Sequence, residues 1–199
     1  MYVTNQPLMN KCLLMFFCFF YLPAAMFAQN KAVTKQAIMF STLFENMKST
    51  HGNVFSSGSF VVSKMLNKKF EAGFGIETAF TSKHHDNGFV LYKLRFIPLF
   101  GNVKYHFNKA GKFDFFTESA IGLSFNRYHR ARDESPNIKT RVREKGVFAY
   151  TGGGLRYPIS RQINLITGIG IKGYKMSFNV LDINPHGISG MIGFNIKNL

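Results

Sequence analysis

Two carboxylates four residues apart, Asp114 and Glu118, have the side chains that acid and base catalysis requires. They lie in the stretch KFDFFTESAIGLSFNRY, residues 112–128, where apolar and polar residues alternate. A period of two is typical of an extended strand with unlike faces, and both carboxylates fall on the more polar face. We expect these groups to act as counter-ions for buried cations, so we predict no catalytic residues and no enzyme activity.

Two other groups of residues have side chains of the types used in metal binding or enzyme catalysis. His84, His85 and Asp86 are of the types that bind metal ions, but adjacent residues in a loop do not form a site without further ligands. We therefore predict no metal site and no cofactor. His186 and Ser189 would suit a lipid-modifying barrel enzyme, yet no acid at a fitting spacing accompanies them. Such an enzyme remains the third hypothesis.

The composition favours a single all-β domain. The 199 residues include 18 glycines, 23 phenylalanines and 8 tyrosines, and only 18% of them are charged. The formal net charge of +15 indicates an anionic partner. Both cysteines, Cys12 and Cys18, lie in the opening segment, so cysteine content does not report the compartment of the mature chain.

The opening segment indicates export. Lys11 is followed by the apolar run CLLMFFCFFYLPAAMFA, which is typical of a secretory signal peptide cleaved after Ala28. We predict a signal peptide over residues 1–28, a short polar lead over 29–36 and one β-barrel domain over 37–199. Export argues against nucleic acid as the anionic partner.

The remainder of the chain shows repeated two-residue periodicity, broken by turn residues. A helix is an open alternative for the first segment, and Pro98 predicts a bulge or bend in the fourth. Connections after the second, fourth and sixth segments are short, whereas polar loops are predicted over 82–88, over 129–144 and after the seventh segment. Short turns at one end and long loops at the other are typical of outer-membrane barrels. We predict an eight-stranded antiparallel up-and-down transmembrane β-barrel with both termini in the periplasm. The expected strands are 37–47, 53–65, 70–81, 92–107, 112–128, 145–157, 162–178 and 188–197.

The two faces of these strands differ in chemistry. Aromatic residues near the short turns would form a girdle at the membrane interface, and Phe80 and Phe125 would belong to the opposite girdle. The other face mixes glycines with charges of both signs, as a small barrel interior filled by ion-paired side chains requires. We expect Lys104 and Asp114 to pair across a tight turn. The predicted lumen ion-pair residues are Glu71, Glu77, Lys104, Asp114, Glu118, Arg156 and Lys172.

The predicted loop 129–144 and its flanks are strongly basic. On the cell surface they would face the phosphates of lipopolysaccharide, which arginine binds in bidentate fashion. A solvated loop whose charge only aids solubility is the open alternative. The candidate lipopolysaccharide contacts are Arg127, Arg130, Arg132, Lys139, Arg141 and Arg143.

The runs FEAGFGIETAF, FIPLFGNVKYHF and KFDFFTESAIGLSF, with GVFAYTGGGLRYPIS and INLITGIGIKGYKM, resemble small outer-membrane β-barrel proteins. The resemblance is to the OmpA/OmpX-like class, in particular the short "outer membrane protein beta-barrel domain" type, and covers about residues 38–199. It implies an eight-stranded barrel in the outer membrane, usually without enzymatic activity.

The leading hypothesis is a non-enzymatic integral outer-membrane barrel with a structural or surface-interaction role. We expect a monomer whose partners are outer-membrane lipid, including lipopolysaccharide, and the barrel-assembly machinery during insertion, with no nucleic acid. The alternative is a soluble secreted or periplasmic barrel that binds a small apolar ligand. That alternative requires Phe74, Phe115 and Ile169 to lie in the interior.

Overall fold

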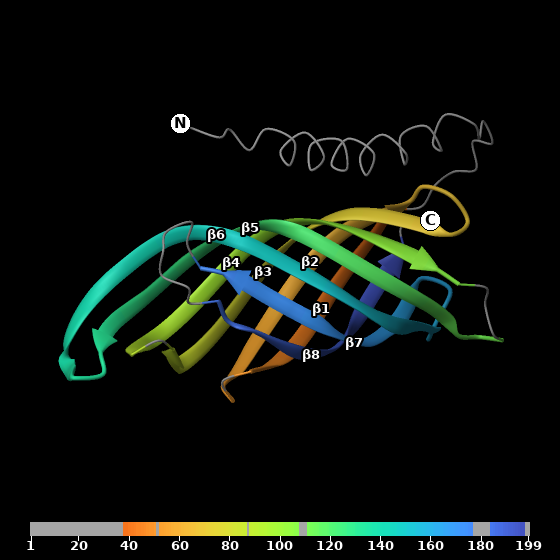
Figure 1. Cartoon of the computed structure of the whole chain (residues 1–199). Helices are drawn as coiled ribbons and strands as arrows, with labels where there is room; N and C mark the ends of the chain where they lie inside the picture. Colours follow the sequence, from red (N-terminus) through yellow and green to blue (C-terminus); the bar gives the residue numbers. More distant parts are fainter. Residues whose placement is uncertain (1–37, 51, 87, 108–110, 177–183, 198–199) are drawn as a thin grey trace, which may run out of the picture. The chain divides into compact units, whose positions relative to one another are not determined.

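The computed structural model describes residues 38–50, 52–86, 88–107, 111–176 and 184–197. The predicted signal peptide and polar lead, 1–28 and 29–36, lie outside these residues. The described residues form eight strands, with labels as in Figure 1. These are β1 (Ile38–Ser49), β2 (Val54–Met65), β3 (Phe70–Asp86), β4 (Phe89–His106), β5 (Asp114–Arg132), β6 (Ser135–Pro158), β7 (Ile163–Lys175) and β8 (His186–Lys197).

The strands close into a barrel in sequence order. Each strand pairs antiparallel with the next, and β8 pairs with β1 from Met39↔Lys197 to Ser49↔Gly187. This confirms the predicted eight-stranded antiparallel up-and-down barrel. It also confirms that the first segment is a strand, not a helix. Within the described residues, no helix is long and apolar enough to cross a membrane.

The two ends of the barrel differ. At one end, here the short-turn end, β1 begins, β8 ends and brief turns join β2 to β3 and β6 to β7. At the opposite end, here the hairpin end, β3–β4 and β5–β6 project beyond the shorter strands (Figure 1). The predicted loops over 82–88 and 129–144 are therefore wrong. Strand pairing continues to Asp86↔Phe89 in one hairpin and to Arg132↔Ser135 in the other.

Polar composition predicts loops in these stretches because strand prediction depends mainly on apolar alternation. Aromatic and β-branched residues nevertheless persist in both arms of the longer hairpin, and Tyr128 lies opposite Val142. Such residues favour extended backbone even outside a core. The consequence is a hydrogen-bonded, projecting hairpin where the sequence indicates an irregular loop.

The irregularity predicted at Pro98 lies elsewhere. Pro98 pairs in regular register with Ser124, whereas the β4–β5 register shifts by one residue between Tyr92 and Arg95. Lys93 within this shift has a φ of 51°, in the left-handed region that non-glycine residues rarely adopt. The bulge therefore marks the base of the projecting hairpin, and the proline is accommodated without it.

The strand faces are oriented opposite to those of a soluble barrel, because apolar side chains point outward and ionisable side chains point inward. Along β5, odd-numbered residues such as Ile121 and Leu123 are exposed, and even-numbered residues such as Phe116 and Glu118 are buried. The outer wall is largely apolar, and the interior contains both hydrophobic and ionisable side chains.

Candidate functional site: a filled lumen and a basic outer face

A turn-end cluster of charges fills the lumen near the short turns. Its centre is Glu71 on β3, which is almost fully buried. Ser63 Oγ donates to Glu71 Oε1 at 2.7 Å, and Arg156 Nη2 donates to Glu71 Oε2 at 2.6 Å. We define the turn-end cluster as Glu71, Lys104, His106, Asp114, Glu118 and Arg156.

Lys104 lies between two carboxylates. The register places it opposite Glu71 on one side and opposite Glu118 on the other. Its Nζ is 3.8 Å from Glu71 Oε1 and 3.6 Å from Glu118 Oε2, and 5.3 Å from the centroid of the Phe116 ring. Asn102 Nδ2 donates to Glu118 Oε1 at 2.5 Å. Three adjacent strands thus present negative, positive and negative groups in one row.

Asp114 belongs to the turn-end cluster, but its partners differ from the predicted one. Its Oδ1 is 3.0 Å from His106 Nδ1, and its Oδ2 is 3.8 Å from Arg156 Nη1. The predicted pair of Lys104 with Asp114 is replaced by these contacts, because the β4–β5 register places Lys104 opposite Glu118. The connection is wider than a tight turn, since the N–H of Phe107 donates to the carbonyl of Phe115.

A central cluster lies further into the barrel and consists of Glu45, Glu77 and Lys172. Lys172 Nζ forms ion pairs with Glu45 and, at 2.9 Å, with Glu77 Oε2. The O–H of Tyr174 donates to Glu77 Oε1 at 2.5 Å. The Lys172 ammonium also lies 5.7 Å from the centroid of the Phe148 ring. Opposite charges and hydrogen bonds together offset the desolvation of these buried groups.

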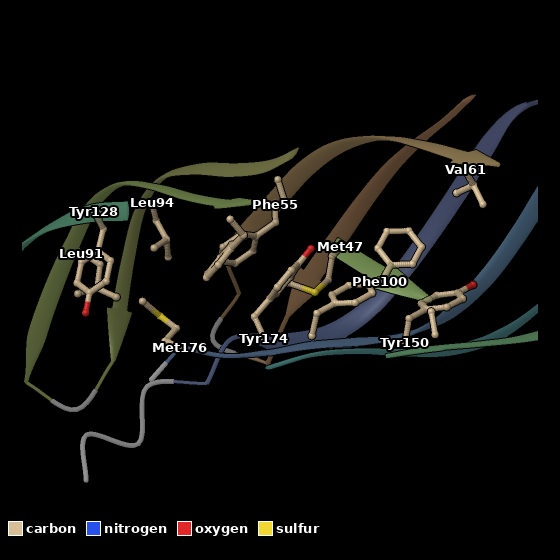
Figure 2. Packing of buried hydrophobic residues seen from close by; sticks show 14 residues of the cluster. Met47, Phe55, Val61, Leu91, Leu94, Phe100, Tyr128, Tyr150, Tyr174 and Met176 are labelled. Atoms are coloured by element: carbon tan, nitrogen blue, oxygen red, sulfur yellow. The ribbon is translucent and has the colours of Figure 1, made fainter. Parts of the chain in front are cut away.

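An aromatic plug fills the lumen from the level of the central cluster toward the hairpin end. Phe96 and Tyr174 stack with ring centroids 4.3 Å apart, and Phe148 contacts Tyr174 at 5.5 Å. Figure 2 shows the larger buried cluster, in which the labelled side chains of Met47, Phe55, Leu94, Phe100 and Tyr174, among others, converge on the interior. We define the aromatic plug as Phe55, Phe96, Phe100, Phe148 and Tyr174.

Glycines make room for these side chains. A Cβ added at Gly170 would lie 2.5 Å from Tyr150 Cε2, and one added at Gly152 would lie 2.5 Å from Tyr150 Oη and from the carbonyl oxygen of Ile169. The space left between the two charge clusters is a cavity of about 20 Å³, lined by Glu77, Glu118 and neighbouring residues. A cavity of that size holds about one water molecule. The lumen is therefore filled at this level.

The candidate metal and enzyme residues are not brought together. His84 is buried, with its Nδ1 3.0 Å from Asn53 Nδ2, whereas His85 faces outward 3.6 Å from Asp133. Within the described residues, no group of three or more His, Cys, Asp or Glu side chains is arranged so that it could hold a metal ion. His186 is exposed and Ser189 is buried, so the two side chains lie on opposite faces of β8.

The basic residues occupy several environments on the β5–β6 hairpin. Arg127 and Arg143 are exposed and lie opposite each other, and Arg132 and Arg141 are exposed nearer the tip. Arg130 is only partly exposed and lies 5.2 Å from the Phe89 ring. Lys139 Nζ lies 4.4 Å from the centroid of the Tyr92 ring.

Glu144, the carboxylate next to Arg143 in sequence, is hydrogen-bonded to Tyr128. Glu144 Oε1 accepts a hydrogen bond from the Tyr128 hydroxyl at 2.9 Å. Burial, followed by the hydrogen bond to Glu144, raises the pKa of Tyr128 well above its ordinary value, so the hydroxyl remains the donor. Glu144 is thereby held on the opposite side of the strand from Arg143.

Sequence reasoning missed two ionisable members of the lumen and the aromatic plug. Glu45 is on β1, where the pattern is irregular, and His106 lies at the inward position two residues after Lys104. The plug could have been found from spacing alone. Phe100 is four residues before Lys104, and Tyr174 is two residues after Lys172, so both share the face of the predicted charges.

Comparison with known proteins supports the fold. No family model matches the chain, and no curated protein matches it significantly. A major outer membrane protein from Thermus thermophilus matches with a TM-score of 0.55 and 11% identity, covering 81% of this chain and 100% of that chain. The N-terminal β-barrel domain of Pseudomonas aeruginosa OprF matches with a TM-score of 0.49, 15% identity and coverages of 81% and 100%. Ail, the attachment invasion locus protein of Yersinia pestis, matches with a TM-score of 0.49, 6% identity and coverages of 82% and 97%.

Proposed function

We propose that this chain is a non-enzymatic, integral outer-membrane β-barrel protein with a structural or surface-interaction role and a closed lumen. The proposal places the barrel wall in lipid, the short-turn end in the periplasm and the projecting hairpins outside the cell. The predicted signal peptide would be removed on export. Lipid, including lipopolysaccharide, is the proposed partner of the mature protein, and the barrel-assembly machinery is its proposed partner during insertion.

The observation that carries the proposal is the outward orientation of the apolar side chains. Phe74 is 80% exposed, Ile169 64% and Phe115 43%, although a soluble ligand-binding barrel would need all three inside. Soluble proteins rarely expose contiguous apolar patches of more than a few hundred Å². A wall of this kind is stable when lipid, not water, surrounds it.

Aromatic residues near the short-turn end support the same placement. Phe70 and Tyr105 pack with ring centroids 5.2 Å apart, as do Tyr105 and Phe107, and Phe113 packs 5.5 Å from Tyr157. Rings gathered at one height on the outside of a barrel suit the membrane interface. The aromatic girdle would therefore mark the periplasmic boundary.

The basic hairpin is the proposed surface-interaction element. Its exposed cations include Arg127, Arg132, Arg141 and Arg143, which would lie at or above the outer leaflet. Arginine binds phosphate in a bidentate, charge-assisted manner, so phosphorylated glycolipid is the proposed contact.

Fractionation tests the proposal directly. We expect the full-length protein to remain in the membrane pellet after washing with alkaline carbonate, and to require detergent for extraction. Its folded form should migrate differently from the boiled form on detergent gels, since closed barrels resist unfolding by detergent at low temperature. Recovery of the protein in the aqueous wash would refute the membrane assignment.

A further inference from the structure

Three arginines form a row across neighbouring strands on the outer face of the barrel. Arg95 on β4 lies opposite Arg127 on β5, and Arg127 lies opposite Arg143 on β6. All three side chains are exposed. We call Arg95, Arg127 and Arg143 the arginine row. Arg95, the member of the row on β4, precedes Arg127 by 32 residues in sequence, so only strand pairing reveals the row.

A row of this kind is unfavourable without an anion. Directly opposed residues on neighbouring strands have Cβ atoms about 4.5–5.5 Å apart, and like charges at that spacing repel. The adjacent carboxylate, Glu144, lines the same depression, but it accepts the Tyr128 hydrogen bond, and among the described residues it forms no ion pair with the three arginines. A phosphate group placed between the guanidinium groups would convert this repulsion into charge-assisted hydrogen bonds.

The surface beside the row is apolar on its barrel-centre side. The next outward positions in register are Ile97, Phe125 and Lys145, and the positions after these include Leu99 and Leu123. Lys145 Nζ lies 5.7 Å from the centroid of the Phe125 ring, at the border between apolar and basic surface.

The row and its apolar border enclose a shallow depression. Its volume is about 300 Å³, and it is lined by the arginine row together with Ile97, Phe125, Asn126, Glu144 and Lys145. One side of the depression therefore presents cations and the other side presents hydrocarbon. An anionic amphiphile would satisfy both sides, whereas a free anion would use only the basic side.

We propose that the arginine row is a binding site for one phosphate group of a phosphorylated outer-leaflet glycolipid, whose acyl chain lies along Ile97 and Phe125. The site rests on the proposed function, because it requires the apolar wall to be in lipid. It deepens that function by assigning the phosphate to three particular arginines, one of them from outside the predicted basic hairpin.

The test uses the folded, full-length mature barrel in phosphatidylcholine nanodiscs that contain a minor fraction of lipid A. The row variant is Arg95→Gln, Arg127→Gln and Arg143→Gln combined, and Arg127→Gln alone is measured in case the triple variant does not fold. The matched charge control is Lys48→Gln, Lys83→Gln and Lys175→Gln combined, which removes the same charge from exposed positions near the hairpin end of β1, β3 and β7. Native mass spectrometry measures the lipid A bound per barrel. The difference in gel migration between unheated and boiled samples reports whether each variant is folded.

We expect the row variant to bind lipid A about tenfold more weakly than the unaltered protein, since charge-assisted hydrogen bonds are lost. Arg127→Gln should fall between the two, and the charge control should bind lipid A nearly as well as the unaltered protein. Millimolar inorganic phosphate should not displace lipid A, because it cannot occupy the apolar side.

Three results would overturn the site. Equal losses in the row variant and the charge control would show diffuse attraction, and unchanged binding in the row variant would show that the arginines are not used. Displacement by inorganic phosphate would show that lipid is not required. In each case the barrel would still insert and show heat-modified migration, so the membrane assignment would stand. A barrel that fails to insert at all would instead refute the proposed function and, with it, the site.

Discussion

At the scale of single residues, buried charge is arranged by strand register. Glu71, Lys104 and Glu118 occupy one row across β3, β4 and β5, so each backbone pair also brings opposite charges together. A register slip of one residue would turn every one of these side chains to the outer wall. The ion pairs therefore help to specify one register, in addition to any contribution to stability.

Glu71→Ala should destabilise the barrel strongly. The substitution leaves Lys104, His106 and Arg156 without their shared carboxylate in a buried site, and removing one partner of a buried ion pair costs about 3–5 kcal/mol. The measurement is urea unfolding of the barrel in lipid vesicles. Glu134→Gln, at an exposed hairpin turn, is the control and should leave the midpoint unchanged. A Glu71 variant as stable as this control would contradict a structural role for the cluster.

Gly152→Ala should also be costly, although alanine suits a strand better than glycine does. The new methyl would lie 2.5 Å from the backbone oxygen of Ile169, so the β6–β7 pair must shift. Overpacking of this kind costs about 1–3 kcal/mol. Gly190→Ala is the matched control, because a Cβ there meets nothing within 4 Å. Unfolding in lipid vesicles compares the two, and equal stability of both variants would argue against close packing at Gly152.

At the scale of elements, strand length shows which strands only span the barrel wall and which also project beyond it. A strand needs about 9–11 residues to cross a membrane obliquely, and β1, β2 and β8 have 12 residues each. Strand β5 has 19 and β6 has 24, so this hairpin extends far beyond the wall. Both parts have exposed apolar side chains, and only the wall should require them.

Ile121→Arg and Ile138→Arg test that distinction on the same hairpin. Ile121 is 68% exposed on the wall and Ile138 is 73% exposed near the tip, so their accessibility in the isolated barrel is similar. Arginine at the bilayer midplane should cost about 2–4 kcal/mol, whereas arginine at the tip should cost about 0–1 kcal/mol. Unfolding in lipid vesicles gives both values. Equal costs would mean that Ile121 does not face lipid.

The sequence was sufficient to predict the strands because their periodicity is strong. Alternation over 70–81 and 112–128 identified β3 and β5, and the count of eight strands followed, whereas the pairing of β1 with β8 that closes the barrel is known only from the structure. It was insufficient to predict the hairpins, since polar strands beyond a core lack apolar alternation. The register across 107–113 also escaped prediction, because the length of a turn does not report how its flanking backbone pairs.

The dependence on register between strands also explains why the inward-facing charges could be predicted but one of their pairings could not. Each charge on the inward face could be identified by parity along its own strand, as for Glu71 and Lys172. Which charges meet depends on register between strands, so the Lys104–Asp114 pairing was wrong. The arginine row is the same case on the outer face, since Arg95 and Arg127 meet only through the β4–β5 ladder.

At the scale of the whole molecule, the filled interior predicts a protein that does not conduct. The turn-end cluster, the central cluster and the aromatic plug succeed one another along the lumen, and the cavity between the charges holds about one water molecule. We expect liposomes containing the barrel to remain impermeable to small sugars in a swelling assay. A porin reconstituted at the same density is the positive control. Swelling comparable to that of the porin would contradict the closed lumen.

Barrel closure has a consequence for how the protein reaches its final state. The seam joins Met39 to Lys197, the most distant paired positions in the described chain, so it forms only after β8 is available. Until then, β1 and the last strand added each have one edge whose backbone N–H and C=O groups are unpaired. Such edges can pair with other chains. Bringing such distant segments together is also slow, because the entropy of closing a long loop must be lost first. The open intermediate, with its apolar wall and bare edges, is therefore the form most prone to aggregation, and the rate of seam closure should limit the yield of folded protein.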